Sequence, residues 1–378
     1  MTGNKTSGHK KLGFFNSFIL VVNILFIFAL SLSYLSVHIS PEKSWILPFF
    51  GLLYPFLIII NIFFAIYWVL RLKWLFLISA IFILAGWSHL ERLVQFNSPR
   101  TSPANSTSFK IISYNVKNLS NDNVDLIEPQ IRNKILDFLD EEDADILCLQ
   151  EFAIVHPDPE AFIDSLSERL AMPYHAYIQY FEKPRKRIDA IFTFSKYPIL
   201  KSGSVKKDYQ YNYAMFTDLL MGIDTVRLFN IHLESVRLKH EDYNFISELD
   251  LQFEENEDIK EGSRRIFEKL KTAFARRASQ VENLSSCIIR SPYPVILCGD
   301  FNDTPNSYAY QQLTVNLNDA FMESGNGFGN TYIGNLPSYR IDFILYDDHF
   351  TSWNCNRKLI KLSDHYPVIC IMGKAPGY

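Results

Sequence analysis

The stretch Val295-Ile-Leu-Cys-Gly-Asp-Phe-Asn302 joins four apolar residues to a polar turn sequence. Its apolar half predicts a strand buried in a sheet, and Gly299-Asp300-Phe301-Asn302 follows where that strand ends. Further short apolar runs predict strands in the same way: Phe109–Val116, Asp145–Leu149, Asp189–Phe194, Val226–Leu233 and Arg340–Tyr346.

Segments with helical periodicity lie between some of these predicted strands. Residues 127–139 place Ile131, Ile135, Phe138 and Leu139 on one face, which predicts a helix that covers a sheet. Arg264–Ile289 predicts a longer helix. Strands alternating with amphipathic helices indicate the α/β class, with sheets covered by helices.

Polar residues stand at the ends of the predicted strands, where an apolar core would not select them. They form six clusters: Tyr114-Asn115, Gln150-Glu151, Asn230-Ile231-His232, Gly299-Asp300-Phe301-Asn302, Arg340-Ile341-Asp342 and Ser363-Asp364-His365. Each alone has an ordinary structural explanation as a turn, a cap or a loop carboxylate. Together they supply the groups that hold a hard divalent cation, activate water and neutralise a phosphoryl group.

These six clusters, in this order, resemble the signature of the endonuclease/exonuclease/phosphatase superfamily, over residues 109–373. That superfamily includes pancreatic deoxyribonuclease, apurinic endonucleases, neutral sphingomyelinases and inositol polyphosphate 5-phosphatases. The resemblance implies a four-layer sandwich, in which two mixed β-sheets pack face to face with helices outside.

The resemblance also implies roles for single residues. Glu151 is expected to ligate Mg²⁺, or Mn²⁺, with Asn115 and Asp364 nearby as ligands or orienting groups. Lys117 stands where some relatives carry an acidic residue, which argues against a second metal ion.

The expected catalytic group has five members. Asp342 is expected to polarise His365, and Asp300 to orient or deprotonate the attacking water. Asn302 is expected to donate to a phosphoryl oxygen, and His232, if protonated, to stabilise developing negative charge or the leaving group. The sequence leaves open whether the general base is Asp300 or His365, and Asp189 is the candidate partner of His232.

The chain before residue 97 has a different character. Three apolar stretches, Phe14–Val37, Ile46–Leu70 and Trp74–Leu90, predict about three transmembrane helices. The predicted organisation is therefore a membrane anchor over residues 1–96, a Ser/Pro-rich linker over 97–108 and a catalytic domain over 109–378.

Positive charge predicts the orientation of this anchor. Five basic residues flank the side of the N-terminus (Lys5, Lys10, Lys11, Arg71 and Lys73), and three flank the other side (Lys43, Arg92 and Arg100). Excess positive charge marks the cytoplasmic side, so we expect a multi-pass protein of a bacterial-type inner membrane with its catalytic domain outside the cytoplasm.

Composition narrows the function further. A formal net charge of −4 argues against a protein that coats nucleic acid. Five cysteines without a CxxC spacing indicate neither a disulfide framework nor a zinc site.

The sequence thus predicts a membrane-anchored, metal-dependent hydrolase that cleaves a phosphodiester or phosphomonoester by in-line attack of an activated water. Its expected partners are the lipid bilayer and a phosphoester substrate, either nucleic acid or a phospholipid or inositol-phosphate headgroup, and no protein partner is indicated. A catalytically inactive module that binds a phosphate ligand on the same fold is the alternative. A transport protein is disfavoured, since the apolar stretches contain no Asp or Glu.

Overall fold

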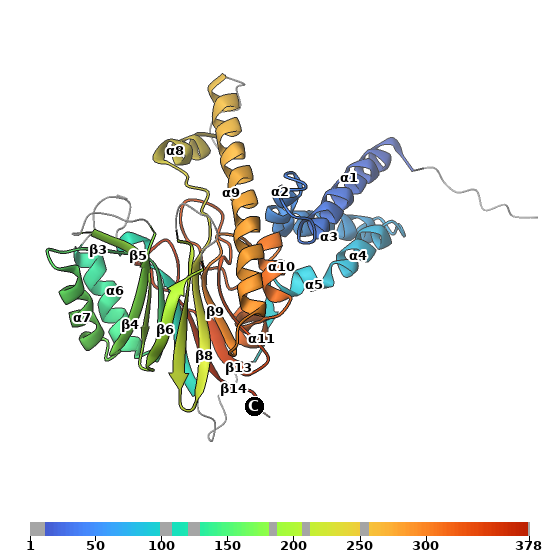
Figure 1. The fold of residues 1–378 in the computed structure, drawn as a ribbon. Helices are drawn as coiled ribbons and strands as arrows, with labels where there is room; N and C mark the ends of the chain where they lie inside the picture. Colours follow the sequence, from blue (N-terminus) through green and yellow to red (C-terminus); the bar gives the residue numbers. More distant parts are fainter. Residues whose placement is uncertain are drawn as a thin grey trace, which may run out of the picture.

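Two six-stranded sheets form the centre of the molecule (Figure 1). The computed structural model describes residues 12–98, 108–119, 129–180, 187–205, 212–249 and 257–376. The first sheet has the order β13 (Phe350–Arg357), β14 (Val368–Lys374), β2 (Ser108–Asn115), β3 (Ile146–Val155), β5 (Arg187–Ser195) and β4 (Tyr174–Gln179). It is mixed, because β2 and β3 are parallel and the other neighbours are antiparallel.

The second sheet is mixed in the same way. Its order is β10 (Asn318–Asp319), β12 (Asp342–Tyr346), β9 (Val295–Asp300), β8 (Asp224–His232), β7 (Ala214–Met221) and β6 (Ile199–Ser204). Only the β8–β9 pair is parallel among these described strands.

Helices cover the outer faces of both sheets. One apolar core fills the space between the sheets, with Ile111 and Ile146 from one sheet and Leu228 and Ile296 from the other. Two other cores join the first sheet to α6 (Pro129–Glu142) and α7 (Pro159–Arg169), and the second sheet to α9 (Glu257–Ile289) and α10 (Tyr308–Thr314). Two mixed sheets flanked by helices confirm the predicted architecture. Shorter elements complete it: η1 (Lys117–Leu119), α8 (His240–Leu249), α11 (Ala320–Ser324), β1 (Gln95–Phe96) and β11 (Asn326–Gly327).

Five helices precede the sandwich: α1 (Phe14–Ser36), α2 (Leu47–Leu52), α3 (Tyr54–Leu70), α4 (Phe76–Ala85) and α5 (Trp87–Glu91). Of the described helices, α1 alone is long and apolar enough to cross a membrane. The prediction of about three transmembrane helices is therefore wrong in number.

Local breaks explain the shorter helices. The second apolar stretch divides at Leu53, and Pro55 stands in the first turn of α3. The third stretch divides at Gly86, which ends α4. With a rise of 1.5 Å per residue, α3 is about 26 Å long and α4 about 15 Å, against a hydrocarbon core of about 30 Å.

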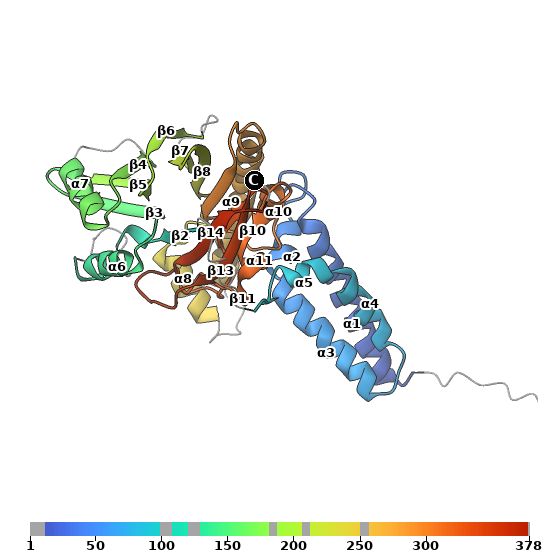
Figure 2. The same cartoon turned by 90° about the horizontal axis from the view of Figure 1, so that it is seen from below.

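These helices form a bundle that projects from the sandwich and packs against it at one end (Figure 2). His89 Nδ1 lies 2.9 Å from Asn306 Oδ1, and the guanidinium of Arg92 donates to Gln311 at 2.6 Å. Strand β1 also pairs with β11. Most of the predicted linker, residues 99–107, lies outside the described residues, as do Lys5, Lys10 and Lys11. The domain boundaries stay a prediction.

Candidate active site

Strand register brings the polar clusters to one edge of the sandwich. In the second sheet, Asp300 pairs with His232 on one side and with Asp342 on the other. In the first sheet, Asn115 pairs with Gln150, directly before Glu151. The amide of Asn115 then joins the two sheets, because its Nδ2 donates to Asp300 Oδ2 at 2.9 Å.

The turn after β9 requires its particular residues. Gly299 has φ +146°, and a Cβ there would lie 2.0 Å from the carbonyl oxygen of Ile231. Asn302 adopts φ 52°, and its backbone N–H donates to Asp300 Oδ1 at 2.7 Å. Its side-chain amide donates to the other carboxylate oxygen at 3.2 Å. Glycine therefore permits the close approach of two strands, and the Asp300 carboxylate stabilises the turn that follows.

Glu151 occupies a β-bulge in β3. The register of β3 against β5 shifts between Leu149 and Phe152, and Glu151 has φ 50°. A bulge redirects a side chain and leaves backbone groups without ladder partners. The Glu151 carboxylate lies at the site, with Oε1 3.3 Å from Asn115 Nδ2 and 3.3 Å from His232 Nε2.

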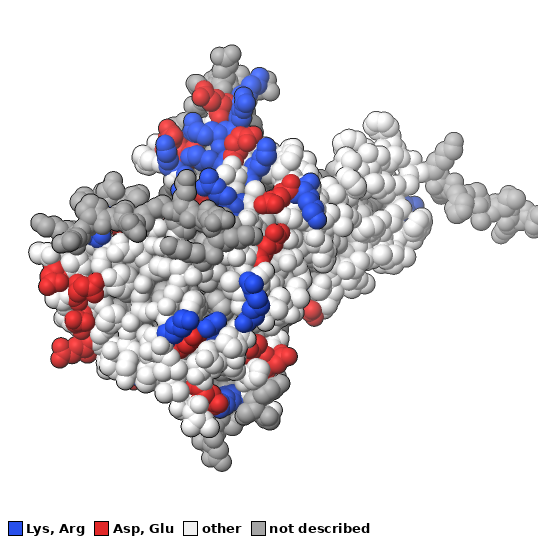
Figure 3. Space-filling view, in the orientation of Figure 1, with Lys and Arg blue, Asp and Glu red and all other residues white. Residues whose placement is uncertain are grey.

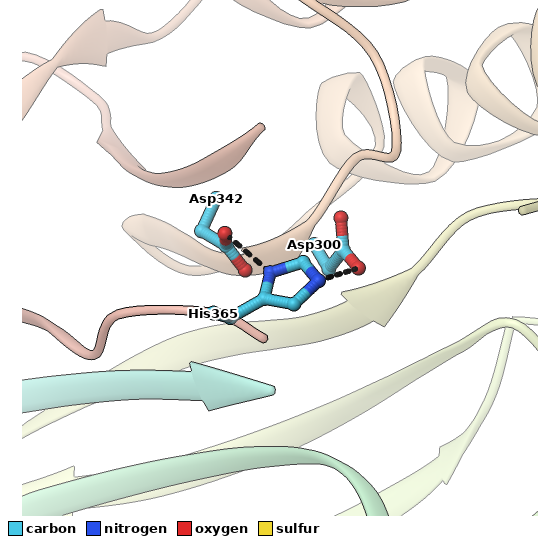
Figure 4. Close-up of side chains that lie close together, drawn as sticks. All are labelled: Asp300, Asp342 and His365. Atoms are coloured by element: carbon cyan, nitrogen blue, oxygen red, sulfur yellow. Dashed lines mark hydrogen bonds and ion pairs between the residues drawn. The ribbon is translucent and has the colours of Figure 1, made fainter. Parts of the chain in front are cut away.

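His365 and Asp342 form a buried pair beside Asp300 (Figure 4). His365 Nδ1 lies 2.8 Å from Asp342 Oδ2, and His365 Nε2 lies 3.8 Å from Asp300 Oδ2. Burial alone would lower the pKa of His365, but the Asp342 and Asp300 carboxylates outweigh it and raise the pKa to about 10. His365 is therefore an imidazolium at neutral pH.

Two carboxylates of the site, Asp300 and Glu151, have raised pKa values. Burial raises the pKa of Asp300 to about 6, with a further rise from Asp342 and an opposing effect of His365. Burial also raises the pKa of Glu151, and the Asp364 carboxylate adds to that shift. Burial, with a smaller effect of neighbouring carboxylates, therefore disfavours the ionised forms of these two groups.

His232 has a partner that the sequence did not indicate. Its Nδ1 lies 3.1 Å from the hydroxyl of Tyr180, directly after β4. Its Nε2 lies 3.7 Å from Asp300 Oδ2. Asp189, the expected partner, instead lies 3.0 Å from the Arg187 guanidinium. A tyrosine beside a strand end has no sequence pattern that would have identified it.

The loop before β14 completes the site. Asp364 Oδ2 lies 3.5 Å from Lys117 Nζ, and Ser363 Oγ donates to the carbonyl of Asn115 at 2.8 Å. The ring of Tyr332 packs edge-on against His365, and its hydroxyl bonds Tyr243 of α8. All eight residues predicted for the site are thereby brought together: Asn115, Glu151, His232, Asp300, Asn302, Asp342, Asp364 and His365. Their individual roles stay predictions.

These side chains suit a divalent cation. Asp300, Asp342 and His365 each offer a ligand atom within 4.8 Å of the others, and the Glu151 carboxylate lies alongside. Asp342 Oδ1 is buried without a hydrogen-bond partner among the described residues. A bound cation would stabilise the ionised forms of Asp300 and Glu151, which burial and, to a smaller extent, neighbouring carboxylates disfavour, so the donor set fits the group.

Charged surface residues lie mainly outside this site. Lysine and arginine gather on the projecting part of the molecule formed by α8 and α9 (Figure 3). There they pair with buried Asp242, since Arg265 Nε lies 2.7 Å from Asp242 Oδ1 and Lys269 bonds Oδ2. The basic residues Lys183, Arg185 and Lys186 lie outside the described residues.

Comparisons with known proteins agree with this geometry. Residues 112–365 match the family described as the endonuclease/exonuclease/phosphatase family, and residues 16–93 match a domain of unknown function. No curated protein matches the chain.

The solved structures that match this chain have low sequence identity to it. An endonuclease/exonuclease/phosphatase from Beutenbergia cavernae is 13% identical and has a TM-score of 0.50, covering 71% of this chain and 72% of its own. A structure from Bacteroides vulgatus is 19% identical with a TM-score of 0.48, covering 71% and 100%. The human nocturnin catalytic domain with bound sulfate is 17% identical with a TM-score of 0.47, covering 71% and 95%. At these identities, likeness concerns the fold alone.

Proposed function

This chain belongs to the endonuclease/exonuclease/phosphatase family, and from that premise we propose that it is a membrane-anchored, divalent-metal-dependent hydrolase of phosphoester bonds. The observation that carries the proposal is the convergence of Glu151, Asp300 and His365 from three strand ends or loops onto one centre. Mg²⁺ is the proposed ion, with Mn²⁺ as a substitute, because the donors are mainly carboxylate oxygens.

Glu151, with Asn115 and Asp364, is the proposed ligand set. The Asp342–His365 pair is a weaker choice, because its two members already bind each other and His365 is protonated at neutral pH. A metal ligand has to be deprotonated. When bound, the cation supplies charge that neutralises a phosphoryl oxygen.

Asp300 is the proposed general base. Its pKa of about 6 leaves it ionised at neutral pH, yet basic enough to accept a proton from water. His365 cannot accept that proton, since its own pKa is raised to about 10. Between the two residues that the sequence left open as the general base, these pKa directions favour Asp300.

The remaining polar groups stabilise negative charge. Asp342 holds the His365 imidazolium, whose Nε2 lies 3.8 Å from Asp300 Oδ2. Asn302 Nδ2 donates to the same oxygen of Asp300 at 3.2 Å. Both are donors positioned for phosphoryl oxygens, and His232 Nε2 is a third. Water held by Asp300 would attack phosphorus in line with the leaving oxygen, and positioning with electrostatics would supply most of the catalysis.

The N-terminal bundle is the proposed membrane anchor. Its polar groups face inward: Asn23 Nδ2 donates to Ser79 Oγ at 2.9 Å, and Trp68 Nε1 donates to Asn23 Oδ1 at 3.0 Å. Its outer surface is apolar, with Phe28 63% and Phe63 66% exposed, and it carries almost no charge in the view of Figure 3. This inside-out distribution suits lipid and would be costly in water.

Hydrolysis of bis-p-nitrophenyl phosphate tests the enzymatic part. We expect the full-length chain in detergent to release nitrophenol with Mg²⁺ or Mn²⁺ and to stop with EDTA. Asp300→Ala and His365→Ala should abolish the reaction, whereas His349→Ala, a half-exposed histidine outside the site, should retain it. A wild-type rate no higher than that of the two site variants would mean that the protein is a binding module instead.

Two further experiments address substrate and location. A panel of supercoiled DNA, single-stranded DNA, sphingomyelin and inositol phosphates separates nucleic-acid from headgroup substrates. Alkaline phosphatase fused after residue 100 should be active if the catalytic domain lies outside the cytoplasm. An inactive but expressed fusion would reverse the proposed orientation.

A further inference from the structure

Tyr180 lies directly after β4 and touches both Glu151 and His232. Its hydroxyl oxygen accepts a hydrogen bond from the backbone N–H of Glu151 at 2.8 Å and lies 3.1 Å from His232 Nδ1. Its ring packs edge-on against the imidazole, with centroids 5.6 Å apart and an angle of 71° between the planes. Its own N–H donates to the carbonyl of Asp189 at 3.0 Å. Backbone and side chain are both fixed.

The direction of these hydrogen bonds follows from their chemistry. The Glu151 N–H can only donate, so the phenolic oxygen is the acceptor there. The single proton of the phenol then remains for His232 Nδ1, since among the described residues no other acceptor lies within hydrogen-bonding distance of that hydroxyl. A neutral imidazole that accepts at Nδ1 carries its proton on Nε2.

His232 Nε2 faces the centre of the site. It lies 3.3 Å from Glu151 Oε1 and 3.7 Å from Asp300 Oδ2. It is buried and has no hydrogen-bond partner among the described residues. A proton at this position therefore points to the space between the two carboxylates, where the proposed function requires a phosphoryl oxygen.

We propose that Tyr180 is a positioning residue that holds His232 as the neutral tautomer with its proton on Nε2, ready to donate to the phosphoryl group. A carboxylate partner would act in the opposite way, because it accepts from Nδ1–H and favours an imidazolium. The tyrosine therefore makes His232 a neutral hydrogen-bond donor. This inference rests on the proposed phosphoester hydrolysis and specifies how one member of that site acts.

Nitrogen NMR reads the tautomer directly and needs neither metal nor turnover. The full-length chain, labelled with ¹⁵N in its histidine rings and treated with EDTA in detergent, contains nine histidines. His232→Gln assigns the His232 signals by their loss. Above about pH 7.5, where an unperturbed histidine is neutral, we expect a protonated Nε2 and an unprotonated Nδ1 in the wild type. A protonated Nδ1 would overturn the proposal.

Kinetics of Tyr180→Phe provide the second measurement. We expect kcat to fall about 10–100-fold, the usual effect of losing an orienting partner, with KM little changed. Tyr177→Phe is the matched control, because Tyr177 lies on β4, three residues before Tyr180, and its hydroxyl donates to Glu160 at 2.5 Å, outside the site. It should retain wild-type kcat.

A double-mutant cycle separates the two contacts of Tyr180. In a His232→Gln background, Tyr180→Phe should have little further effect if Tyr180 acts through His232. An undiminished loss in that background would mean that Tyr180 acts through Glu151, which refutes the inference. Thermal melting of each variant verifies that it is folded.

The two proposals fail separately. A wild-type chain without metal-dependent hydrolysis would end the proposed function, while the tautomer of His232 stays measurable. An active wild type with the proton of His232 on Nδ1 would end this inference alone.

Discussion

Replacing Asp342 with asparagine removes one charge from the centre of the site and keeps the shape of the side chain. Asp342 and His365 are 2% and 4% exposed, and the bond between them is 2.8 Å long. Solvent therefore cannot compensate for the lost carboxylate. The substitution tests whether His365 works as an imidazolium.

The size of the effect follows from the pKa of His365. A rise from 6.5 to about 10 corresponds to about 5 kcal/mol of preference for the protonated ring. Asp342 lies 2.8 Å from the His365 ring, and Asp300 lies 3.8 Å from it. Asp342 should therefore supply at least half of this preference, and its loss should lower the pKa of His365 from about 10 to about 8.

The sign of the stability effect is fixed by the same shift. A histidine whose pKa is raised by folding contributes stability fully below pH 6.5, and the contribution is lost as the pH rises through about 10. In the variant, the upper end of that window moves to about pH 8.

The assay is kcat/KM as a function of pH. In the wild type we expect the alkaline decline near pH 10, and in Asp342→Asn near pH 8, with kcat about 100-fold lower because the ring is also less well oriented. Asp347→Asn is the matched control, since Asp347 lies 3.1 Å from the more exposed His349 outside the site. It should leave both quantities unchanged. If the alkaline decline of Asp342→Asn coincides with that of the wild type, His365 does not act as an imidazolium.

Further predictions concern single residues and the anchor. Asn302→Ala should lower kcat about 10²–10³-fold with an unchanged melting temperature, as for a lost transition-state donor; near-wild-type turnover would exclude that role. Activity should decline as the pH falls through about 6, because the base must be ionised; activity that stays constant through this pH range would exclude Asp300 as the base. Gly299→Ala should melt well below Gly222→Ala, since a Cβ at Gly299 meets a backbone oxygen at 2.0 Å whereas one at Gly222 (φ +71°) meets nothing within 4 Å; equal melting temperatures would refute the close-approach argument. Removal of residues 1–97 should lower the melting temperature of the catalytic domain, because Asn306 and Gln311 lose partners from the anchor; an unchanged value would show that those contacts are not stabilising.

The sequence predicts the strands that carry the site better than the others. All six predicted strands are present, because buried central strands have continuous apolar runs. The other six strands of the two sheets, β4, β6, β7, β10, β13 and β14, were not predicted. Among them, β6 (Ile199–Ser204) lies at a sheet edge, and β13 (Phe350–Arg357) alternates with polar residues. The predicted helix over 127–139 is observed as α6, with Ile135 and Phe138 buried, although residues 127 and 128 lie outside the described part.

For some residues of the candidate site, proximity follows directly from strand register. Asp300 and Asp342 are partners in adjacent strands, so their proximity follows from the fold. Tyr180 reaches the site because a bulge turns the backbone N–H of Glu151 toward it, and a bulge depends on tertiary packing. The predicted number of membrane-spanning helices was wrong because the prediction used only the length of the apolar stretches. The helices break at Leu53 and Gly86, which that length does not show.

One buried side chain, Arg340, contacts the proposed anchor and lies close in sequence to Asp342 of the candidate site. The Arg340 guanidinium donates to Asp319 Oδ2 at 2.6 Å and to the carbonyl of Arg92 at 3.0 Å. Arg340 is two residues before Asp342, at the start of the strand that positions His365. A buried charge that is paired with a carboxylate resists displacement, because moving it would leave charge unpaired in a low-dielectric interior. The contact between Arg340 and Arg92 therefore helps to hold the end of the helical segment against the sandwich. If the helices before residue 97 lie in a bilayer, the site is held at a set distance from it, and substrates at that distance are favoured over those free in solution.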